Sequence, residues 1–242
     1  DGFTITLANN DDVGNGGGIY LVASGSGNNC EPLIRNSKIS NNYADDGGGI
    51  FILGNGGTAS PELMNCTFSG NHAISGGGIY TEADNSGTVT PTFKNCIITG
   101  NKADNFGGAA YNWIAIGGSG TTAPIFINTT ISGNYAGDYG SALYNVYSNC
   151  TPTLRNCILW GNVDPYSQIS NNTDANPSFS YCNIDFSIIG GSWHDDFGTD
   201  DGGNIEADPL FLEMPDSAQA PTTSGNVALT GKSPCINKGK PT

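Results

Sequence analysis

The chain has 242 residues, 37% of them hydrophobic, which suits one domain with a continuous core. It carries 8 Lys and Arg residues against 22 Asp and Glu residues, so its formal net charge is -14 at pH 7. Because phosphate contacts need clustered cations, this balance argues against nucleic acid and anionic membranes as partners. No apolar run approaches the roughly 18 residues that span a bilayer, so we expect no membrane insertion of this segment.

The N-terminus, Asp1-Gly-Phe-Thr-Ile-Thr6, begins inside what looks like a repeat. It lacks the basic and apolar regions of a signal peptide. We therefore expect the chain to belong to a longer precursor. The abundance of Gly, Asn, Ser and Thr fits a bacterial protein that is secreted or displayed at the cell surface.

A block of seven residues that begins and ends with Asn recurs along the chain, with starts 29, 30, 33 and 28 residues apart. A fixed period in this range marks a solenoid rather than a globule with one central core. The five copies are Asn36-Ser-Lys-Ile-Ser-Asn-Asn42, Asn65-Cys-Thr-Phe-Ser-Gly-Asn71, Asn95-Cys-Ile-Ile-Thr-Gly-Asn101, Asn128-Thr-Thr-Ile-Ser-Gly-Asn134 and Asn156-Cys-Ile-Leu-Trp-Gly-Asn162.

Each repeat predicts three short strands. In chain order, the first contains pairs such as Ile19-Tyr20 and Ile79-Tyr80, the second contains Ile34 and its equivalents two residues after a proline, and the third contains Ile39 and its equivalents. Stacking of equivalent strands predicts an all-β, right-handed parallel β-helix of about six to seven coils. We expect the repeats to occupy residues 1–165, and residues 166–242 to form irregular final coils and a C-terminal cap of the same domain.

Two asparagine columns follow from the repeats. We expect the first column to form an internal amide ladder, since Asn tolerates left-handed backbone angles and stacked amides can hydrogen-bond. The second column lies at the next corner, where a preceding Gly supplies conformational freedom in four copies. The first column is Asn36, Asn65, Asn95, Asn128 and Asn156, and the second is Asn42, Asn71, Asn101, Asn134 and Asn162.

The seven cysteines cannot all pair. Cys66, Cys96 and Cys157 share one repeat position with Ser37 and Thr129, which favours small buried core residues. A disulfide between Cys66 and Cys96 in neighbouring coils is the alternative. The chain has no Cys-x-x-Cys and no Cys/His cluster, so a zinc site is not expected.

The glycine motifs resemble a known family. Gly107-Gly-Ala109, Gly47-Gly-Gly-Ile50, Gly76-Gly-Gly-Ile79 and Phe68-Ser-Gly-Asn71 resemble the paired Gly-Gly-Ala-Ile and Phe-x-x-Asn motifs of polymorphic outer-membrane protein repeats, over roughly residues 1–165. The resemblance implies a surface-associated β-helix.

The C-terminal part is similar to a second group of proteins. The motifs Asn156-Cys-Ile-Leu-Trp-Gly-Asn162, Tyr181-Cys-Asn-Ile184, Gly203-Asn-Ile-Glu-Ala-Asp-Pro-Leu-Phe211 and Ser233-Pro-Cys-Ile-Asn-Lys-Gly239 resemble, in order, the C-terminal segment of choice-of-anchor Q proteins. This resemblance implies an exported bacterial β-helix protein, and an irregular cap that hides the end of the solenoid.

The first predicted strands carry an aromatic stripe. Aromatic faces spaced along a rod can stack on sugar rings or anchor a protein, so we predict adhesion or carbohydrate interaction by a monomer, with a glycan or a surface protein as partner. The alternative is that the intervening loops fold back and cover the rings. The candidate binding residues are Tyr20, Phe51, Tyr80, Tyr111, Trp113 and Tyr144.

A polysaccharide-degrading enzyme, a lyase or a glycoside hydrolase, is the main alternative function. Its candidate catalytic residues are Arg35, Lys94 and Arg155, which share an outward column with Met64 and Ile127 between them. No row of acids accompanies this column, and the sequence therefore favours a non-catalytic role. His72 is expected to be solvated.

Two weaker patterns remain. The acidic, turn-rich segment from His194 to Asn204 offers Asp195, Asp196, Asp200 and Asp201 as ligands for Ca²⁺, although a solvated loop explains it as well. The third strands carry Thr-x-Thr or similar pairs such as Thr67-x-Ser69, as ice-binding faces do, but Lys38, Ile97 and Trp160 interrupt the array.

Overall fold

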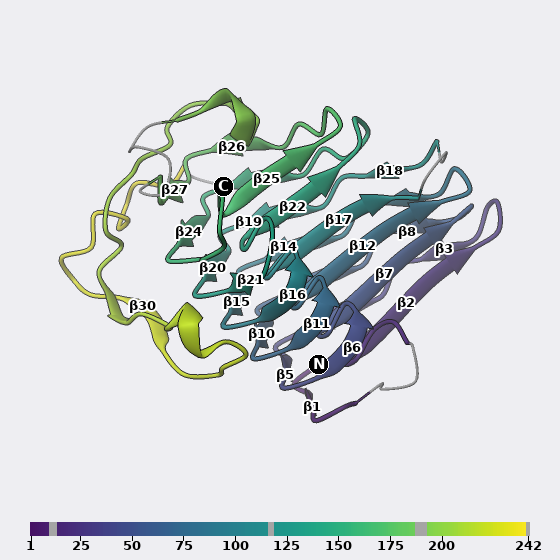
Figure 1. The fold of residues 1–242 in the computed structure, drawn as a ribbon, viewed down its shortest axis with the longest axis horizontal. Helices are drawn as coiled ribbons and strands as arrows, with labels where there is room; N and C mark the ends of the chain where they lie inside the picture. Colours follow the sequence, from purple (N-terminus) through teal and green to yellow (C-terminus); the bar gives the residue numbers. More distant parts are fainter. Residues whose placement is uncertain (10–13, 116–118, 187–192, 241–242) are drawn as a thin grey trace.

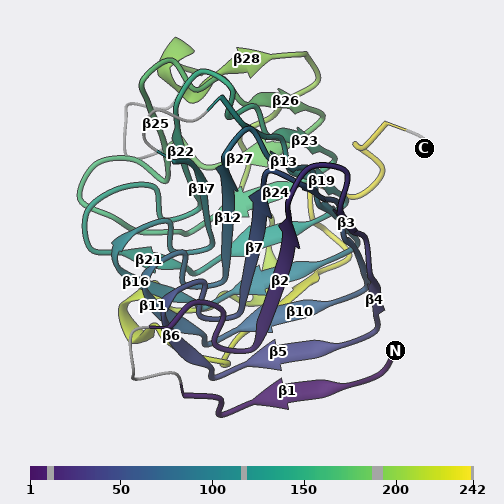
Figure 2. The same ribbon diagram turned by 90° about the vertical axis from the view of Figure 1, so that its right-hand side faces the viewer.

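A computed structural model describes residues 1–9, 14–115, 119–186 and 193–240, and it forms a right-handed parallel β-helix (Figure 1). Five parallel sheets, named A to E here in the order in which a regular coil passes through them, run along the solenoid. Figure 2 views the solenoid obliquely from its N-terminal end and shows sheets A, C and E on different sides of the coils. Sheet A contains β1 (Thr4–Thr6), β5 (Lys38–Ser40), β10 (Thr67–Ser69), β15 (Ile97–Thr99), β20 (Thr130–Ser132), β24 (Ile158–Trp160) and β27 (Asn183–Ile184). Sheet C contains β2 (Ile19–Ser24), β7 (Ile50–Asn55), β12 (Ile79–Asp84), β17 (Ala110–Ile114), β22 (Leu143–Val146) and β25 (Ile169–Asn172). Sheet E contains β4 (Leu33–Arg35), β9 (Glu62–Met64), β14 (Thr92–Lys94), β19 (Ile125–Ile127), β23 (Thr153–Arg155), β26 (Ser178–Ser180) and β28 (Thr199–Asp200).

Sheets B and D were not expected from the sequence. They arise where short segments between the predicted strands also pair with the next coil, so a regular coil has five strands rather than three. The solenoid has about five turns, fewer than the six to seven expected, because the terminal coils lack some of the sheets. Sheet B contains β6 (Tyr43–Asp46), β11 (His72–Ser75), β16 (Lys102–Phe106) and β21 (Tyr135–Ala136), and sheet D contains β3 (Asn29–Cys30), β8 (Thr58–Ala59), β13 (Thr88–Val89) and β18 (Thr121–Thr122).

The interior is a continuous column of side chains that repeats from coil to coil. In sheet E, Phe93 and Phe126 are fully buried and stack with ring centroids 5.0 Å apart. The cysteines of the repeated position lie in the same core, as expected, and the thiol of Cys66 donates a weak hydrogen bond to the carbonyl of Met64 at 3.3 Å. All seven cysteines are free thiols.

The two asparagine columns lie in different places from those expected. Asn65 and its equivalents in the first column have positive φ and form a ladder of amide hydrogen bonds, but on the surface, so the prediction of an internal ladder was wrong for them. The internal ladder is the second column, in which Asn101 is fully buried and donates to the Asn134 Oδ1 at 3.0 Å. The left-handed turn of the first column directs its side chains outward, whereas the second column reaches backbone carbonyls inside the corner.

The C-terminal segment folds back along sheet A. It contains the antiparallel pair β29 (Phe211–Glu213) and β30 (Asn226–Leu229) and a 3₁₀ turn at Ser217–Gln219. We call residues 214–223 the strap. The amide of Thr222 donates to the carbonyl of Gly100 at 2.8 Å, and Met214 lies against Gly161. Figure 1 shows this yellow-green segment beside sheet A.

The outer face of sheet A is therefore not a flat hydroxyl array. Ser69 is 3% exposed and Ser132 is 0% exposed, because the strap and the corner glycines pack beside them. An ice-binding surface needs its hydroxyls in contact with solvent. Burial of the second position in the four middle pairs, at Ser40, Ser69, Thr99 and Ser132, argues against that hypothesis.

Candidate functional site

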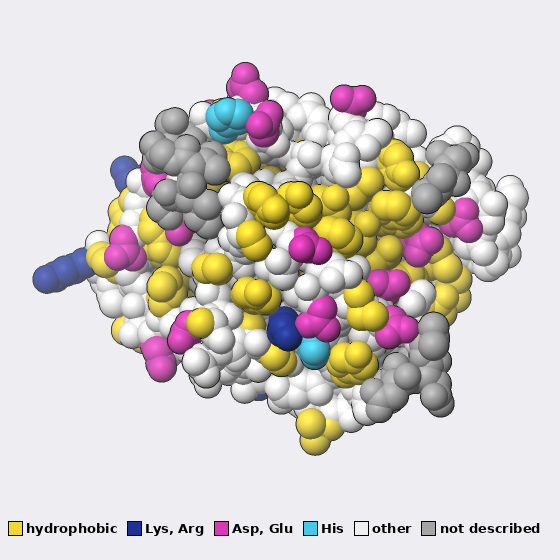
Figure 3. Space-filling model, in the orientation of Figure 1, with side chains coloured by type: hydrophobic (Ala, Val, Ile, Leu, Met, Phe, Trp, Pro, Cys, Tyr) yellow, Lys and Arg dark blue, Asp and Glu magenta, His cyan; other side chains and the backbone are white. Residues whose placement is uncertain are grey.

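The outer face of sheet C carries the aromatic stripe that the sequence predicts. Side chains alternate across a strand, so Ile79 enters the core while Tyr80 points outward. In-register pairing then stacks the rings from coil to coil, with centroids 4.8 Å apart for Phe51 and Tyr80 and 5.2 Å apart for Tyr111 and Tyr144. Figure 3 shows hydrophobic side chains in a band across this face.

Most of the stripe is nevertheless closed to solvent. Tyr20 is 49% exposed, but Phe51 is 0%, Tyr80 and Tyr111 are 6%, and Tyr144 is 8% exposed. Each ring is covered by its neighbours along the stripe and by side chains beside them: Phe106 of sheet B packs on Tyr144, and Trp113, itself half-buried, packs on Tyr111. The stripe is thus a second apolar cluster outside the sheet, and its more accessible rings are Tyr20, at the N-terminal end, and the half-buried Trp113.

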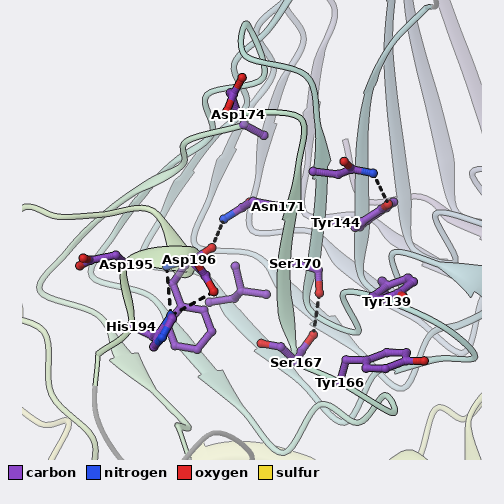
Figure 4. A pocket seen from close by; sticks show the side chains of 14 residues that line it. Tyr139, Tyr144, Tyr166, Ser167, Ser170, Asn171, Asp174, His194, Asp195 and Asp196 are labelled. Atoms are coloured by element: carbon purple, nitrogen blue, oxygen red, sulfur yellow. Dashed lines mark hydrogen bonds and ion pairs between the residues drawn. The ribbon is translucent and has the colours of Figure 1, made fainter.

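A cleft of about 950 Å³ opens at the C-terminal end of the stripe (Figure 4). Strand β25 forms its floor, and the turn Asp195–Phe197 forms one wall. Tyr144 connects the stripe to the cleft. Its lining comprises Tyr139, Tyr144, Tyr166, Ser167, Ile169, Ser170, Asn171, Asn172, Asp174, Ala175, His194, Asp195, Asp196 and Phe197.

Two exposed tyrosines form the aromatic wall of the cleft. The rings of Tyr139 and Tyr166 stack with centroids 4.6 Å apart and an interplanar angle of 13°, and they are 38% and 56% exposed. The buried carboxylate of Asp164 positions them, since it accepts hydrogen bonds from the amide of Ser141 at 2.7 Å and from the amide of Tyr166 at 2.8 Å. One carboxylate thereby joins the two loops that carry the rings.

Polar groups cover the floor and the opposite wall. Asn172 Nδ2 donates to the hydroxyl of Tyr144 at 3.3 Å, and Asn171 Nδ2 donates to the backbone carbonyl of Asp196 at 2.7 Å. His194 Nδ1 lies 3.2 Å from Asp196 Oδ2. The cleft therefore combines flat apolar rings with hydroxyl, amide and carboxylate groups, which is the composition of sites that hold small polar ligands.

A second group of interest lies midway along the stripe. Burial raises the pKa of Asp46 to about 6, helped by the charge of Asp45, and burial together with the charges of Asp46 and Asp84 raises the pKa of Glu82 to about 7. Burial and the charges of Asp46 and Glu82, among others, also raise the pKa of Tyr80. The structure thus holds two half-buried carboxyl groups next to the aromatic rings, a juxtaposition that the sequence did not reveal.

The candidate catalytic cations lie elsewhere. Arg35, Lys94 and Arg155 share the outward column of sheet E, with Met64 and Ile127 between them as expected, and none of them lines the cleft. Arg35 forms an ion pair with Asp1 at 3.8 Å.

His72 is half-buried rather than solvated. Its Nε2 lies 3.0 Å from Asp104 Oδ1, which also pairs with Lys102 Nζ at 2.9 Å. Although desolvation opposes it, hydrogen bonds from His72 and Lys102 lower the pKa of Asp104.

The calcium candidates do not converge. Asp195 and Asp196 line the cleft, whereas Asp200 Oδ1 accepts from the amide of Gly202 at 2.8 Å and from Asn204 Nδ2 at 2.6 Å. Asp201 is exposed. Among the described residues, no group of three or more His, Cys, Asp or Glu side chains is arranged to hold a metal ion.

Residues 65–82 match the Chlamydia polymorphic membrane protein (Chlamydia_PMP) repeat. The matched stretch runs from the surface ladder through β10 and β11 into β12 and contains both Phe68-Ser-Gly-Asn71 and Gly76-Gly-Gly-Ile79. The chain is a β-helix repeat protein that resembles these repeats, which supports a place at a bacterial cell surface. No curated protein and no solved structure matches it significantly. In the part of the chain that the structure describes, no helix is long and apolar enough to cross a membrane.

Proposed function

We propose that this protein is a non-catalytic β-helix scaffold of the bacterial cell surface that binds glycans in the cleft at the end of its aromatic stripe. The observation that carries this proposal is the exposed stack of Tyr139 and Tyr166 beside hydroxyl and amide groups. An aromatic ring covers the apolar face of a sugar, and the polar groups bind its hydroxyls. Of the aromatic residues predicted along the stripe, Tyr144 lines this cleft, whereas Tyr139 and Tyr166 were not among them.

The test is a glycan array followed by calorimetry with the sugars that bind. Tyr166→Ala is expected to weaken binding about tenfold or more, the usual cost of removing a central aromatic contact. Tyr20→Ala is the matched control, because Tyr20 is similarly exposed but lies at the opposite end of the stripe. Binding that survives Tyr166→Ala, or that Tyr20→Ala weakens to the same extent, contradicts a site in the cleft.

The location at the surface of a bacterium, as part of an exported precursor, belongs to the same proposal. The repeat match at residues 65–82 supports the location at the cell surface. A surface protein as the partner in adhesion is compatible with the same exposed rings, since tyrosines also anchor protein interfaces. The resemblance of residues 156–239 to choice-of-anchor Q proteins remains a prediction.

A glycoside hydrolase is the second candidate, and the pair Asp46 and Glu82 favours it. Hydrolysis of a glycosidic bond uses two carboxyl groups, one of which must stay protonated to donate its proton. A pKa of about 7 suits Glu82 for that role. Hydrolysis would be supported if the protein released reducing ends from a polysaccharide that it binds and if Glu82→Gln abolished that release. If no bound polysaccharide released reducing ends, only the binding function would stand.

A further inference from the structure

The walls of the cleft carry charge of one sign. Asp174, Asp195 and Asp196 lie in its lining, and none of the eight Lys and Arg residues of the chain does. Among the described lining residues, His194 is the one histidine, and it lies beside Asp196. Three Asp side chains with no Lys or Arg beside them give the described lining an excess of negative charge.

The geometry separates the aromatic and acidic sides. In Figure 4 the rings of Tyr139 and Tyr166 lie on one side and Asp195 and Asp196 on the other, with Asp174 above them. A sugar ring stacked on the tyrosines would therefore present its edge substituents to carboxylates. Within the described residues, no hydrogen bond or ion pair engages the side chains of Asp174 and Asp195, so their oxygens are available to a ligand.

We infer that the cleft selects oligosaccharides with free amino groups, that is, unacetylated amino sugars. This inference rests on the proposed glycan binding. An ammonium group beside a carboxylate forms a charge-assisted hydrogen bond, which is stronger than the bond that a neutral hydroxyl makes in the same place. The carboxylate of a uronic acid in that position would be repelled by the same wall and by the net charge of -14 of the whole chain.

The experiment compares β-1,4-linked hexasaccharides that differ only at carbon 2 of each sugar. Glucosamine hexamer carries an amine there, cellohexaose a hydroxyl, and N-acetylglucosamine hexamer a neutral amide; an oligogalacturonide serves as the acidic probe. In mildly acidic, low-salt buffer the glucosamine hexamer is expected to bind about tenfold more tightly than cellohexaose, the order expected from two unpaired carboxylates near water. The preference should shrink at about 1 M salt, where the Debye length falls to about 3 Å.

Paired variants locate the selectivity. Asp174→Asn with Asp195→Asn is expected to bring the affinity ratio of the two probes towards one. Asn suits position 174, where φ is 62°. Glu62→Gln removes one negative charge from an exposed position on sheet E and is expected to leave the ratio unchanged.

Each outcome decides between the two proposals. Equal affinity for glucosamine hexamer and cellohexaose would overturn the selection for amino groups but not glycan binding itself. Tighter binding of the oligogalacturonide than of glucosamine hexamer would have the same meaning. If Glu62→Gln reduces the preference for glucosamine hexamer as much as the cleft variants do, the preference comes from the net charge of the whole protein. That result would also overturn the inference. Failure of all four probes, together with an empty glycan array, overturns glycan binding itself.

Discussion

At the scale of single residues, the two asparagine columns show that position decides what the same side chain contributes. The amide of Asn101 makes four hydrogen bonds: it donates to the carbonyl of Phe68 and to Asn134, and it accepts from the backbone and the side chain of Asn71. The amide of Asn95 makes only two ladder bonds, both exposed to solvent. Buried polar groups that lose their partners cost far more than exposed ones.

We therefore predict that Asn101→Ala lowers the free energy of unfolding by about 3–5 kcal/mol, because it leaves a buried carbonyl and a buried amide unpaired. Asn95→Gly, which keeps the left-handed turn, is expected to cost less than about 1 kcal/mol. Urea denaturation measures both. Similar losses for the two variants would mean that the internal ladder is no more important than the surface ladder.

The carboxyl of Glu82 makes stability depend on pH. Its pKa rises from an ordinary 4.5 to about 7 in the folded protein, so folding favours the protonated form. The resulting cost is absent below about pH 4.5 and complete above about pH 7. Glu82→Gln should thus stabilise the fold near pH 8 by about 1 kcal/mol, after a discount for partial solvation, and have little effect near pH 4.

Thermal unfolding at both pH values checks this prediction, with Glu62→Gln as the control at an exposed site. Stabilisation of equal size at both pH values would show that Gln packs better than Glu, and that titration of the carboxyl is not the cause.

At the scale of elements, the strands of sheets A, C and E were predictable, since each repeats an apolar residue at a fixed distance from Asn, Gly or Pro. Strands such as Thr58–Ala59 were not, because two residues carry no periodicity and their pairing exists only between coils. The cleft was missed for a related reason. Tyr139 and Tyr166 lie outside the repeated motif, and only the loops joined by Asp164 bring them together.

The strap makes a prediction at this scale. Gly100 has φ 61°, and a Cβ there would collide with the backbone of Thr222. Gly100→Ala is therefore expected to displace the strap and expose residues 214–223 to proteases. Gly27→Ala is the control, because Gly27 has φ 80° with open space around it. Equal protease sensitivity of the two variants would show that the cleavage results from backbone strain at the substituted glycine rather than from loss of the contact between Gly100 and the strap.

At the scale of the whole molecule, the solenoid is stabilised mainly between neighbouring coils, so its ends depend on what covers them. At the C-terminal side, Asn171 at the end of sheet C is bonded to Asp196, and the strap packs on the corner glycines of several coils, from Gly70 to Gly161. At the N-terminal side, Tyr20 is 49% exposed although its equivalent Phe51 is 0% exposed. The two ends therefore differ in how much apolar surface their coils bury.

This asymmetry predicts the order of local unfolding. The amides of β2 pair with one neighbouring strand and those of β12 with two, so β2 should exchange hydrogen with a lower opening free energy than β12. β25 should stay better protected than β2, because the turn Asp195–Phe197 packs on it. Hydrogen exchange followed by mass spectrometry measures all three strands in one experiment. Equal protection of β2 and β12 would show that the coils open as one cooperative unit. Equal protection of β2 and β25 would show that the turn Asp195–Phe197 adds no protection to the strand that it covers.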